Sequence, residues 1–284
     1  MVAPDPAAGD DDATGNAHGS RAADRTGARS GNDAHADVSP LLRWVDADEC
    51  PRSEPYPCPY LPGRMARQRG FRVAGMPGEL YHELMDRGFR RSGDVFYAMV
   101  CDDCRLCVPI RVPVATFAPS KSQRRALRRN EDVTVQVGPP TFTPEKFALY
   151  RRYLAGQHGR GETAGDGSDS TNGGEREDEF RASMYGAVVD TVEVTYTLGD
   201  RLLATSLLDV CARSVSAVYH FYDPDEGARS LGVFSVLMEI EYTRQLGVPH
   251  YYLGYWIEGA KTMQYKANYR PHELLRSGRW QPAN

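Results

Sequence analysis

The strongest constraint on the fold lies in the C-terminal part of the chain, where three strand-like runs follow one another with almost nothing between them. The runs cover residues 192–198, 201–210 and 215–222. Each run is rich in β-branched and aromatic residues, which favour strands. Gly199-Asp200 and Ala212-Arg213 are the connections, and both are short enough for antiparallel hairpins. The sequence therefore predicts a three-stranded antiparallel meander.

A helix and a further strand complete this unit. The helix is predicted from Ser230 to Leu246, because Gly247 and Pro249 end it there, and the strand follows at residues 251–256. Antiparallel strands, a glycine-bearing loop, a long helix and another strand are the core order of the N-acetyltransferase superfamily. By this analogy we expect an α+β fold of two acetyltransferase-like (GNAT-type) halves with mixed, mostly antiparallel sheets.

Two stretches poor in apolar residues divide the chain. Residues 1–40 carry seven acids and three arginines among Ala, Gly, Ser and Asn, so we expect a disordered acidic tail. Residues 158–175 belong to a Gly-rich stretch that starts at Gly156 and predict a flexible loop. The folded ranges are then a cysteine-containing, basic half at 41–157 and the acetyltransferase-like half at 176–284.

The expected location is the cytoplasm, with no membrane partner. No apolar run approaches the roughly 18 residues that cross a bilayer, and the N-terminus has neither a cationic start nor an apolar segment. In a reducing compartment, clustered thiols more often bind metal than form disulfides.

Three of the six cysteines stand in one Cys-x₂-Cys-x₂-Cys run, formed by Cys101, Cys104 and Cys107. This spacing lets thiolates converge on one ion or cluster, and Cys58 is the candidate fourth ligand. Four thiolates suit tetrahedral zinc and an iron–sulfur cluster equally well. The alternative is three reduced cysteines in a turn.

A basic helix is predicted between Ser120 and Asn130. It carries five bases and no acid: Lys121, Arg124, Arg125, Arg128 and Arg129. Like charges one turn apart repel, so the helix is costly unless it faces a polyanion. Residues 59–130 hold 14 bases and 6 acids, whereas the chain outside the tail is neutral. A nucleic-acid phosphate backbone is one interpretation, and a solvated basic face is the other.

The start of the long helix, Ser230-Leu231-Gly232, is the second candidate site. Its free N–H groups and the positive end of the helix dipole could hold a phosphate or an ester carbonyl oxygen. An ordinary Ser N-cap is the alternative.

The chain resembles a known family through several motifs in the same order. They are Tyr60-Leu61-Pro62, Gly88-Phe89-Arg90-Arg91-Ser92-Gly93, the cysteine run, Ser122-Gln123-Arg124-Arg125, Tyr222-Asp223-Pro224-Asp225, Leu253-Gly254-Tyr255-Trp256-Ile257, and Tyr265-Lys266 with Tyr269-Arg270-Pro271. Together they are similar to the aminoacyl-tRNA–protein transferases of the N-end rule pathway, most closely the short bacterial branch that transfers leucine. The resemblance covers roughly residues 50–280, and His220 stands where the family more often has Thr or Phe.

The resemblance implies transfer of leucine, or alternatively arginine, from aminoacyl-tRNA to proteins with N-terminal Asp or Glu, which marks them for degradation. It implies zinc or an iron–sulfur cluster at Cys58, Cys101, Cys104 and Cys107 and no organic cofactor. The catalytic candidates are Asp223 for the acceptor's ammonium, Ser230 and Gly232 for the oxyanion, and Tyr265 and Lys266 as donors to the leaving oxygen. The substrate-binding candidates are Tyr255 and Trp256, with Lys266 and Arg270, alternatively Arg90 and Arg91, on the acceptor's carboxylate.

Two other functions fit parts of the sequence. A coenzyme-A-dependent N-acetyltransferase would place pyrophosphate at the start of the long helix. A non-catalytic RNA-binding protein stabilised by a bound metal would bind RNA through the basic region and the metal through the cysteines. Aromatic residues beside single charges at two strand ends favour a pocket over a plain binding face.

Overall fold

The computed structural model describes residues 39–158, 176–186 and 188–283. The predicted tail and loop therefore lie almost wholly outside the described residues. Pro40 already begins a helix, and the helix that starts at Pro144 continues through Gly156 to His158, past the expected start of the loop. None of the helices in the described part of the chain is long and apolar enough to cross a membrane.

The helices are α1 (Pro40–Asp46), α2 (Gly78–Met85), α3 (Lys121–Arg129), α4 (Pro144–His158), α5 (Glu177–Tyr185), α6 (Leu231–Gln245) and α7 (Lys261–Gln264), with 3₁₀ helices η1 (Pro224–Arg229) and η2 (Tyr265–Asn268). The strands are β1 (Tyr56–Pro57), β2 (Met65–Ala66), β3 (Gln68–Arg72), β4 (Arg90–Ser92), β5 (Val95–Met99), β6 (Cys107–Pro113), β7 (Thr134–Gly138), β8 (Thr191–Leu198), β9 (Arg201–Cys211), β10 (Ser214–Tyr222), β11 (His250–Ile257), β12 (His272–Arg276) and β13 (Arg279–Ala283).

The largest element is an eight-stranded sheet of order β13-β12-β6-β11-β10-β9-β8-β7. Strands β8, β9 and β10 form the predicted antiparallel meander, and only β10 and β11 run parallel. The predicted α+β class with mixed, mostly antiparallel sheets is confirmed. Strands β6 and β7 come from residues 41–157, so both folded ranges contribute to one sheet, and residues 39–284 form one compact unit.

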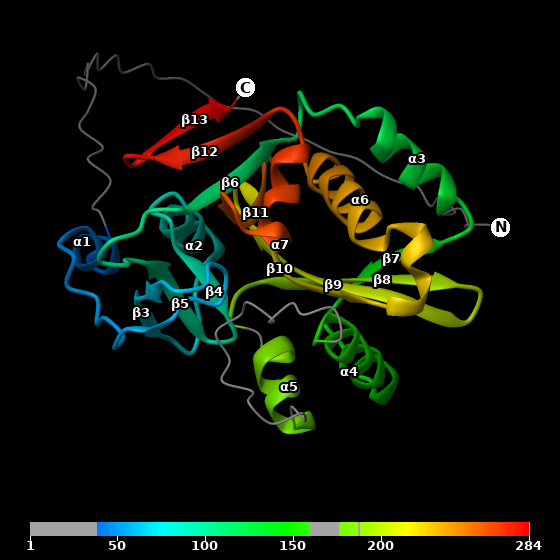
Figure 1. The fold of residues 1–284 in the computed structure, drawn as a ribbon, viewed down its shortest axis with the longest axis horizontal. Helices are drawn as coiled ribbons and strands as arrows, with labels where there is room; N and C mark the ends of the chain where they lie inside the picture. Colours follow the sequence, from blue (N-terminus) through cyan, green and yellow to red (C-terminus); the bar gives the residue numbers. More distant parts are fainter. Residues whose placement is uncertain (1–38, 159–175, 187, 284) are drawn as a thin grey trace, which may run out of the picture. The chain divides into compact units, whose positions relative to one another are not determined.

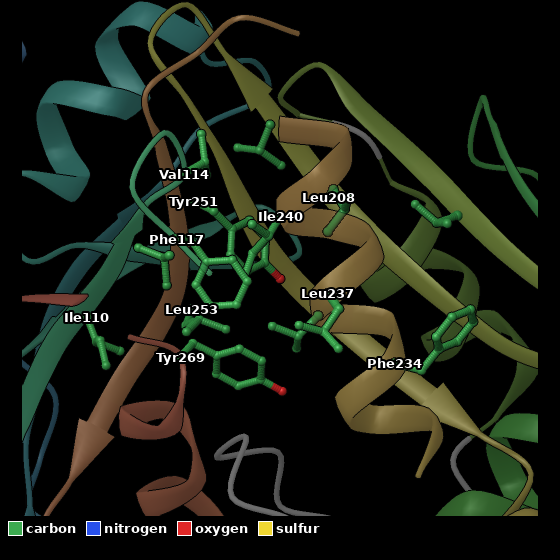
Figure 2. Packing of buried hydrophobic residues seen from close by; sticks show 14 of the residues in the cluster. Ile110, Val114, Phe117, Leu208, Phe234, Leu237, Ile240, Tyr251, Leu253 and Tyr269 are labelled. Atoms are coloured by element: carbon green, nitrogen blue, oxygen red, sulfur yellow. The ribbon is translucent and has the colours of Figure 1, made fainter. Parts of the chain in front are cut away.

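Helix α6 covers one face of this sheet and supplies much of the main core (Figure 1). Figure 2 shows Leu237 and Ile240 of α6 near the sheet residues Tyr251 and Leu208, with Phe234 of the same helix farther from them. The ring of Phe234 lies 5.8 Å from that of Tyr196 on β8. On the other face, α4 and α5 bury a second cluster that includes Tyr150 and Phe180. Burying both faces makes this sheet the rigid support of the molecule.

A separate three-stranded sheet, of order β3-β5-β4, packs with α2 around a further core that includes Tyr81, Phe89 and Phe96. This small sheet matters for function because β4 carries Arg90 and Arg91.

Helix α3 lies within the predicted range, and Ser120 is its N-cap. Ser120 Oγ accepts the Gln123 N–H at 3.3 Å, and Gln123 Oε1 accepts the Ser120 N–H at 2.8 Å, which together form a capping box. All five basic side chains of the predicted helix are exposed.

Candidate active site

The site begins where β10 and β11 separate. Their parallel pairing is limited to Ser214–Ser216 against His250–Tyr252, although the strands are nine and eight residues long. Beyond this point β10 has a register shift between Ala217 and Tyr219, and each strand pairs only with its other neighbour. Backbone groups of both strands are therefore open to side chains from elsewhere.

Arg90 reaches this separation from β4. Its Nη1 donates to Ser216 Oγ at 2.8 Å, its Nη2 donates to the Ala217 carbonyl, and the residue is 8% exposed. The neighbouring Arg91 points to the opposite face, where it forms a bidentate ion pair with buried Asp209 at 2.6 and 2.8 Å and donates to the Gly93 carbonyl. The contacts of Arg91 stabilise the fold. Of the two arginines, Arg90 is therefore the one that can act in the candidate active site.

Lys266 approaches the same place from η2. Its Nζ donates to the Tyr255 carbonyl at 3.0 Å, and the residue is 8% exposed. Gly254 has φ +92°, and a Cβ there would lie 3.5 Å from Lys266 Nζ, 3.5 Å from Arg90 Nη2 and 3.4 Å from Arg90 Nε. Burial and the charge of Arg90 lower the pKa of Lys266 from 10.5 to about 7.

No carboxylate among residues 39–158, 176–186 and 188–283 forms an ion pair with Arg90 or Lys266. Other buried cations beside this sheet do have such a partner, as Arg91 has Asp209 and Lys146 has Glu193. Two buried cations without a carboxylate are unfavourable until an anion binds. The arrangement is chemically suited to a carboxylate ligand.

The remaining charged candidates lie apart from this pair. Asp223 is 2% exposed, pairs with Arg152 and with Arg201 at 3.7 Å, and accepts the Asp225 N–H at 3.1 Å. These contacts favour a role in holding the start of η1 over a role as a free anion. Arg270 is exposed, and its Nε donates to the Ala267 carbonyl at 3.4 Å. The structure thus pairs Lys266 with Arg90, and not with Arg270.

The turn before α6 has an unusual backbone. Ser230 is left-handed, with φ 57° and ψ 48°, and its carbonyl accepts the N–H groups of Val233 and Phe234 at 2.9 and 3.0 Å. Among the described residues, no acceptor is found for the N–H groups of Leu231 and Gly232. The predicted oxyanion role of Ser230 and Gly232 stays a prediction that this geometry permits.

The aromatic candidates differ in exposure. Tyr255 is 7% exposed and donates to the Gly88 carbonyl at 2.8 Å, so it links β11 to the segment before β4. Trp256 Nε1 is buried without a partner among the described residues. Tyr265 is 43% exposed, beside Lys266, and its ring lies 6.5 Å from that of Tyr269. Of these, Tyr265 has the most exposed side chain.

Three of the four predicted metal ligands, Cys101, Cys104 and Cys107, line one hollow of about 490 Å³ together with Met99, Arg105 and Leu275, and Cys58 is not among its lining residues. Burial and, to a smaller extent, the neighbouring thiols Cys101, Cys58 and Cys104 together raise the pKa of Cys107 to about 12. Within the described part of the chain, no three His, Cys, Asp or Glu side chains are arranged to ligate one ion. The donor chemistry suits a thiophilic metal, and the prediction stays a prediction.

Three contributors were not predicted as site residues. Ser216 and Asn268 accept hydrogen bonds from Arg90 and Gln123, and neither has a local sequence signal. Gly254 does have one, because an isolated glycine inside a strand pattern often marks a close approach.

Two family models match this chain. The description "Arginine-tRNA-protein transferase, N terminus" covers residues 56–125, and "Arginine-tRNA-protein transferase, C terminus" covers residues 145–276. The chain belongs to the arginine-tRNA–protein transferase family, and the resemblance given by its motifs is confirmed. As a member of this family it is a transferase.

Individual curated relatives of this chain carry a more specific name than the family models. An aspartate/glutamate leucyltransferase of Gluconacetobacter diazotrophicus is 42% identical over 80% of this chain and 85% of its own length. One of Chromobacterium violaceum is 40% identical over 80% of this chain and 90% of its own length.

Similarity to solved structures is weaker. FemX matches with a TM-score of 0.44 and 10% identity, over 68% of this chain and 65% of its own. L-PGS from Bacillus licheniformis matches with a TM-score of 0.40 and 15% identity, over 63% and 49%.

Proposed function

We propose that the protein transfers leucine from charged tRNA to the N-terminal amine of proteins that begin with Asp or Glu. The names of its curated relatives support this reaction. The observation that carries the acceptor preference is the buried pair Arg90 and Lys266, which has no carboxylate partner among the described residues. An acceptor's Asp or Glu side chain supplies the missing charge. The product would enter N-end rule degradation, and the cytoplasmic location stays a prediction.

The chemistry needs little more than positioning. The acceptor's α-amine has a pKa of roughly 7.7–8, so a useful fraction is neutral near pH 7. Its nitrogen attacks the ester carbonyl carbon, an amide bond forms, and the bond to the tRNA ribose oxygen breaks. The amine loses a proton, and the ribose oxygen gains one. Holding the amine against the ester contributes most of the rate.

Three sets of groups act directly on the substrates in this step. Arg90 and Lys266 hold the acceptor's carboxylate, which places the adjacent α-amine near η2. The hydroxyl of Tyr265 donates to the leaving oxygen, and the N–H groups of Leu231 and Gly232 face the oxyanion. Asp223 has an indirect role: it holds η1 in place, because it forms ion pairs with Arg152 and Arg201.

The exposed face of α3 is the proposed tRNA contact. Lys121, Arg125 and Arg128 are exposed and project from one helix. Such a row of bases suits a phosphate backbone and would give salt-dependent affinity.

We further propose that Cys58, Cys101, Cys104 and Cys107 hold zinc or an iron–sulfur cluster. Three of these thiols line one hollow, and all four interact electrostatically. Thiolates favour both kinds of centre. Such a centre would stabilise the loop that precedes β6.

The test is a transfer assay with purified protein. The tRNA is charged separately with labelled leucine, arginine or phenylalanine, and the peptides begin with Asp, Glu, Asn, Arg or Ala. We expect label from leucyl-tRNA in the Asp and Glu peptides only. Transfer from arginyl-tRNA alone would reject leucine as the donor, and equal use of Asp and Asn peptides would reject the carboxylate site.

A further inference from the structure

Helix α3 has a buried side as well as an exposed one, and it lies beside α6 (Figure 1). Two polar residues on the buried side are Gln123, 4% exposed, and Asn130, 2% exposed. They stand seven residues apart, close to two helical turns, and therefore share one face. Each reaches a different part of the candidate active site.

Gln123 connects α3 to the segment that carries Lys266. Its Oε1 accepts the Ser120 N–H at 2.8 Å, and its Nε2 donates to the Asn268 carbonyl at 3.2 Å. Asn268 is the last residue of η2, two positions after Lys266. The two ends of one amide therefore have separate tasks, because the oxygen caps α3 and the nitrogen holds η2.

Asn130 connects the other end of α3 to the start of α6. Its Nδ2 donates to the Ala126 carbonyl at 2.8 Å and to the Arg229 carbonyl at 2.9 Å. The Arg229 carbonyl directly precedes left-handed Ser230. Next to this link, Arg129 Nη1 donates to the Ala228 carbonyl at 2.7 Å and to Ser230 Oγ at 3.1 Å. Three hydrogen bonds from the end of α3 thus fix the turn that sets the start of α6.

We propose that Gln123 and Asn130 are positioning residues that join the two reacting segments to the helix that binds tRNA. The inference rests on the proposed function. Helix α3 then carries tRNA phosphates on its exposed face and holds η2 and the α6 turn on its buried face. Small displacements of reacting groups cost large factors in rate. Both links therefore control transfer, although neither residue touches a substrate.

The test uses variants that separate the cap from the link. Gln123→Glu keeps an oxygen for the Ser120 N–H and removes the donor to Asn268. We expect it to raise KM for Asp and Glu peptides at least tenfold and to lower the preference for Asp over Asn peptides. Asn130→Asp removes the donor to Arg229. We expect kcat to fall at least tenfold with Asp and Glu peptides while that preference is kept.

Ser120→Ala is the matched control, because it removes the acceptor of the capping box and leaves the Gln123 nitrogen on Asn268. It should lower the melting temperature and keep wild-type KM, kcat and affinity for leucyl-tRNA. If Gln123→Glu does not fold, Gln123→Leu takes its place, since it removes the link without burying a charge.

The inference is overturned if the Gln123 and Asn130 variants lose activity only in proportion to their loss of folded protein. It is also overturned if the Gln123 variant keeps the wild-type preference for Asp over Asn peptides, or if the Asn130 variant loses that preference. Wild-type protein with no leucine transfer would overturn the proposed function instead, so the two failures are distinguishable.

Discussion

The guanidinium of Arg90 and the ammonium of Lys266 meet at one glycine, Gly254, although they come from distant parts of the chain, β4 and η2. Arg90 is held by β10 and Lys266 by β11, so the separation of these two strands defines the distance between the cations. A side chain at position 254 would lie against both. The fold therefore holds the two cations side by side at this position.

Arg90 and Arg91 are adjacent in the sequence, but substitutions at the two positions should have different effects. Substitution of Arg91 should lower the stability of the fold. Arg91→Gln leaves Asp209 buried without its partner, and removing one member of a buried pair costs about 3–5 kcal/mol. Chemical denaturation measures this loss. The double variant Arg91→Gln with Asp209→Asn should recover part of it, because no uncompensated charge remains. Equal stability of wild type and Arg91→Gln would contradict the assignment of Arg91 to the fold.

Lys266 should make stability depend on pH. Its pKa falls from 10.5 to about 7 on folding, so the unfolded chain binds more protons between these values. Stability should therefore rise with pH from about 7 to about 10, by at most about 1.4 kcal/mol per pH unit. Urea unfolding at pH 7, 8 and 9 measures the slope, and Lys266→Met should be flatter. Parallel curves for the two proteins would show that Lys266 is not desolvated.

The exposed bases of α3 should govern the salt dependence of tRNA binding. Arg125→Ala with Arg128→Ala should lower affinity for charged and uncharged tRNA alike. The slope of log K against log[salt] should fall by about 0.7–0.9 for each phosphate that the variant no longer neutralises. Arg181→Ala, which removes an exposed arginine of α5, is the control and should leave the slope unchanged. An unchanged slope in the α3 variant would make this face a solvated surface.

The cysteine proposal predicts a joint loss of metal and stability. Cys101→Ser or Cys104→Ser should reduce bound zinc or iron and lower the melting temperature, because a bound metal stabilises the fold that presents its ligands. Cys211→Ala is the control, since Cys211 is buried in the cluster around α2. It should lower stability without changing metal content. Less than a tenth of an equivalent of metal in anaerobically purified wild type would reject the site.

Local elements of this fold follow from local sequence. The meander was predictable because two-residue connections leave no other arrangement, and α3 was predictable because Ser120 and Gln123 provide a capping box. The exposure of the basic residues on α3 was predictable as well, because charged side chains are rarely buried without a partner. These features depend on residues a few positions apart.

The choice among the candidate cations depends on long-range pairing. Strand geometry places Arg90 and Arg91 on opposite faces of β4, but only the position of Asp209 on distant β9 decides which of them is neutralised. The same is true of Lys266 and Arg270, because packing of η2 buries the first and leaves the second exposed. Joining β6 to β11 is likewise a long-range event without a local signal.

The most direct test of the account compares leucine transfer to peptides that differ only in Asp or Asn at the N-terminus. Asn keeps the size of Asp and removes its charge, so the ratio of kcat/KM values reports the carboxylate interaction alone. Truncating one side of a buried charge pair costs about 2–5 kcal/mol. We predict a strong preference for Asp in wild type and in Arg270→Gln, and a ratio that falls toward one in Arg90→Gln and in Lys266→Met. Retention of the wild-type ratio in both of these variants would contradict the claim that this cation pair reads the acceptor.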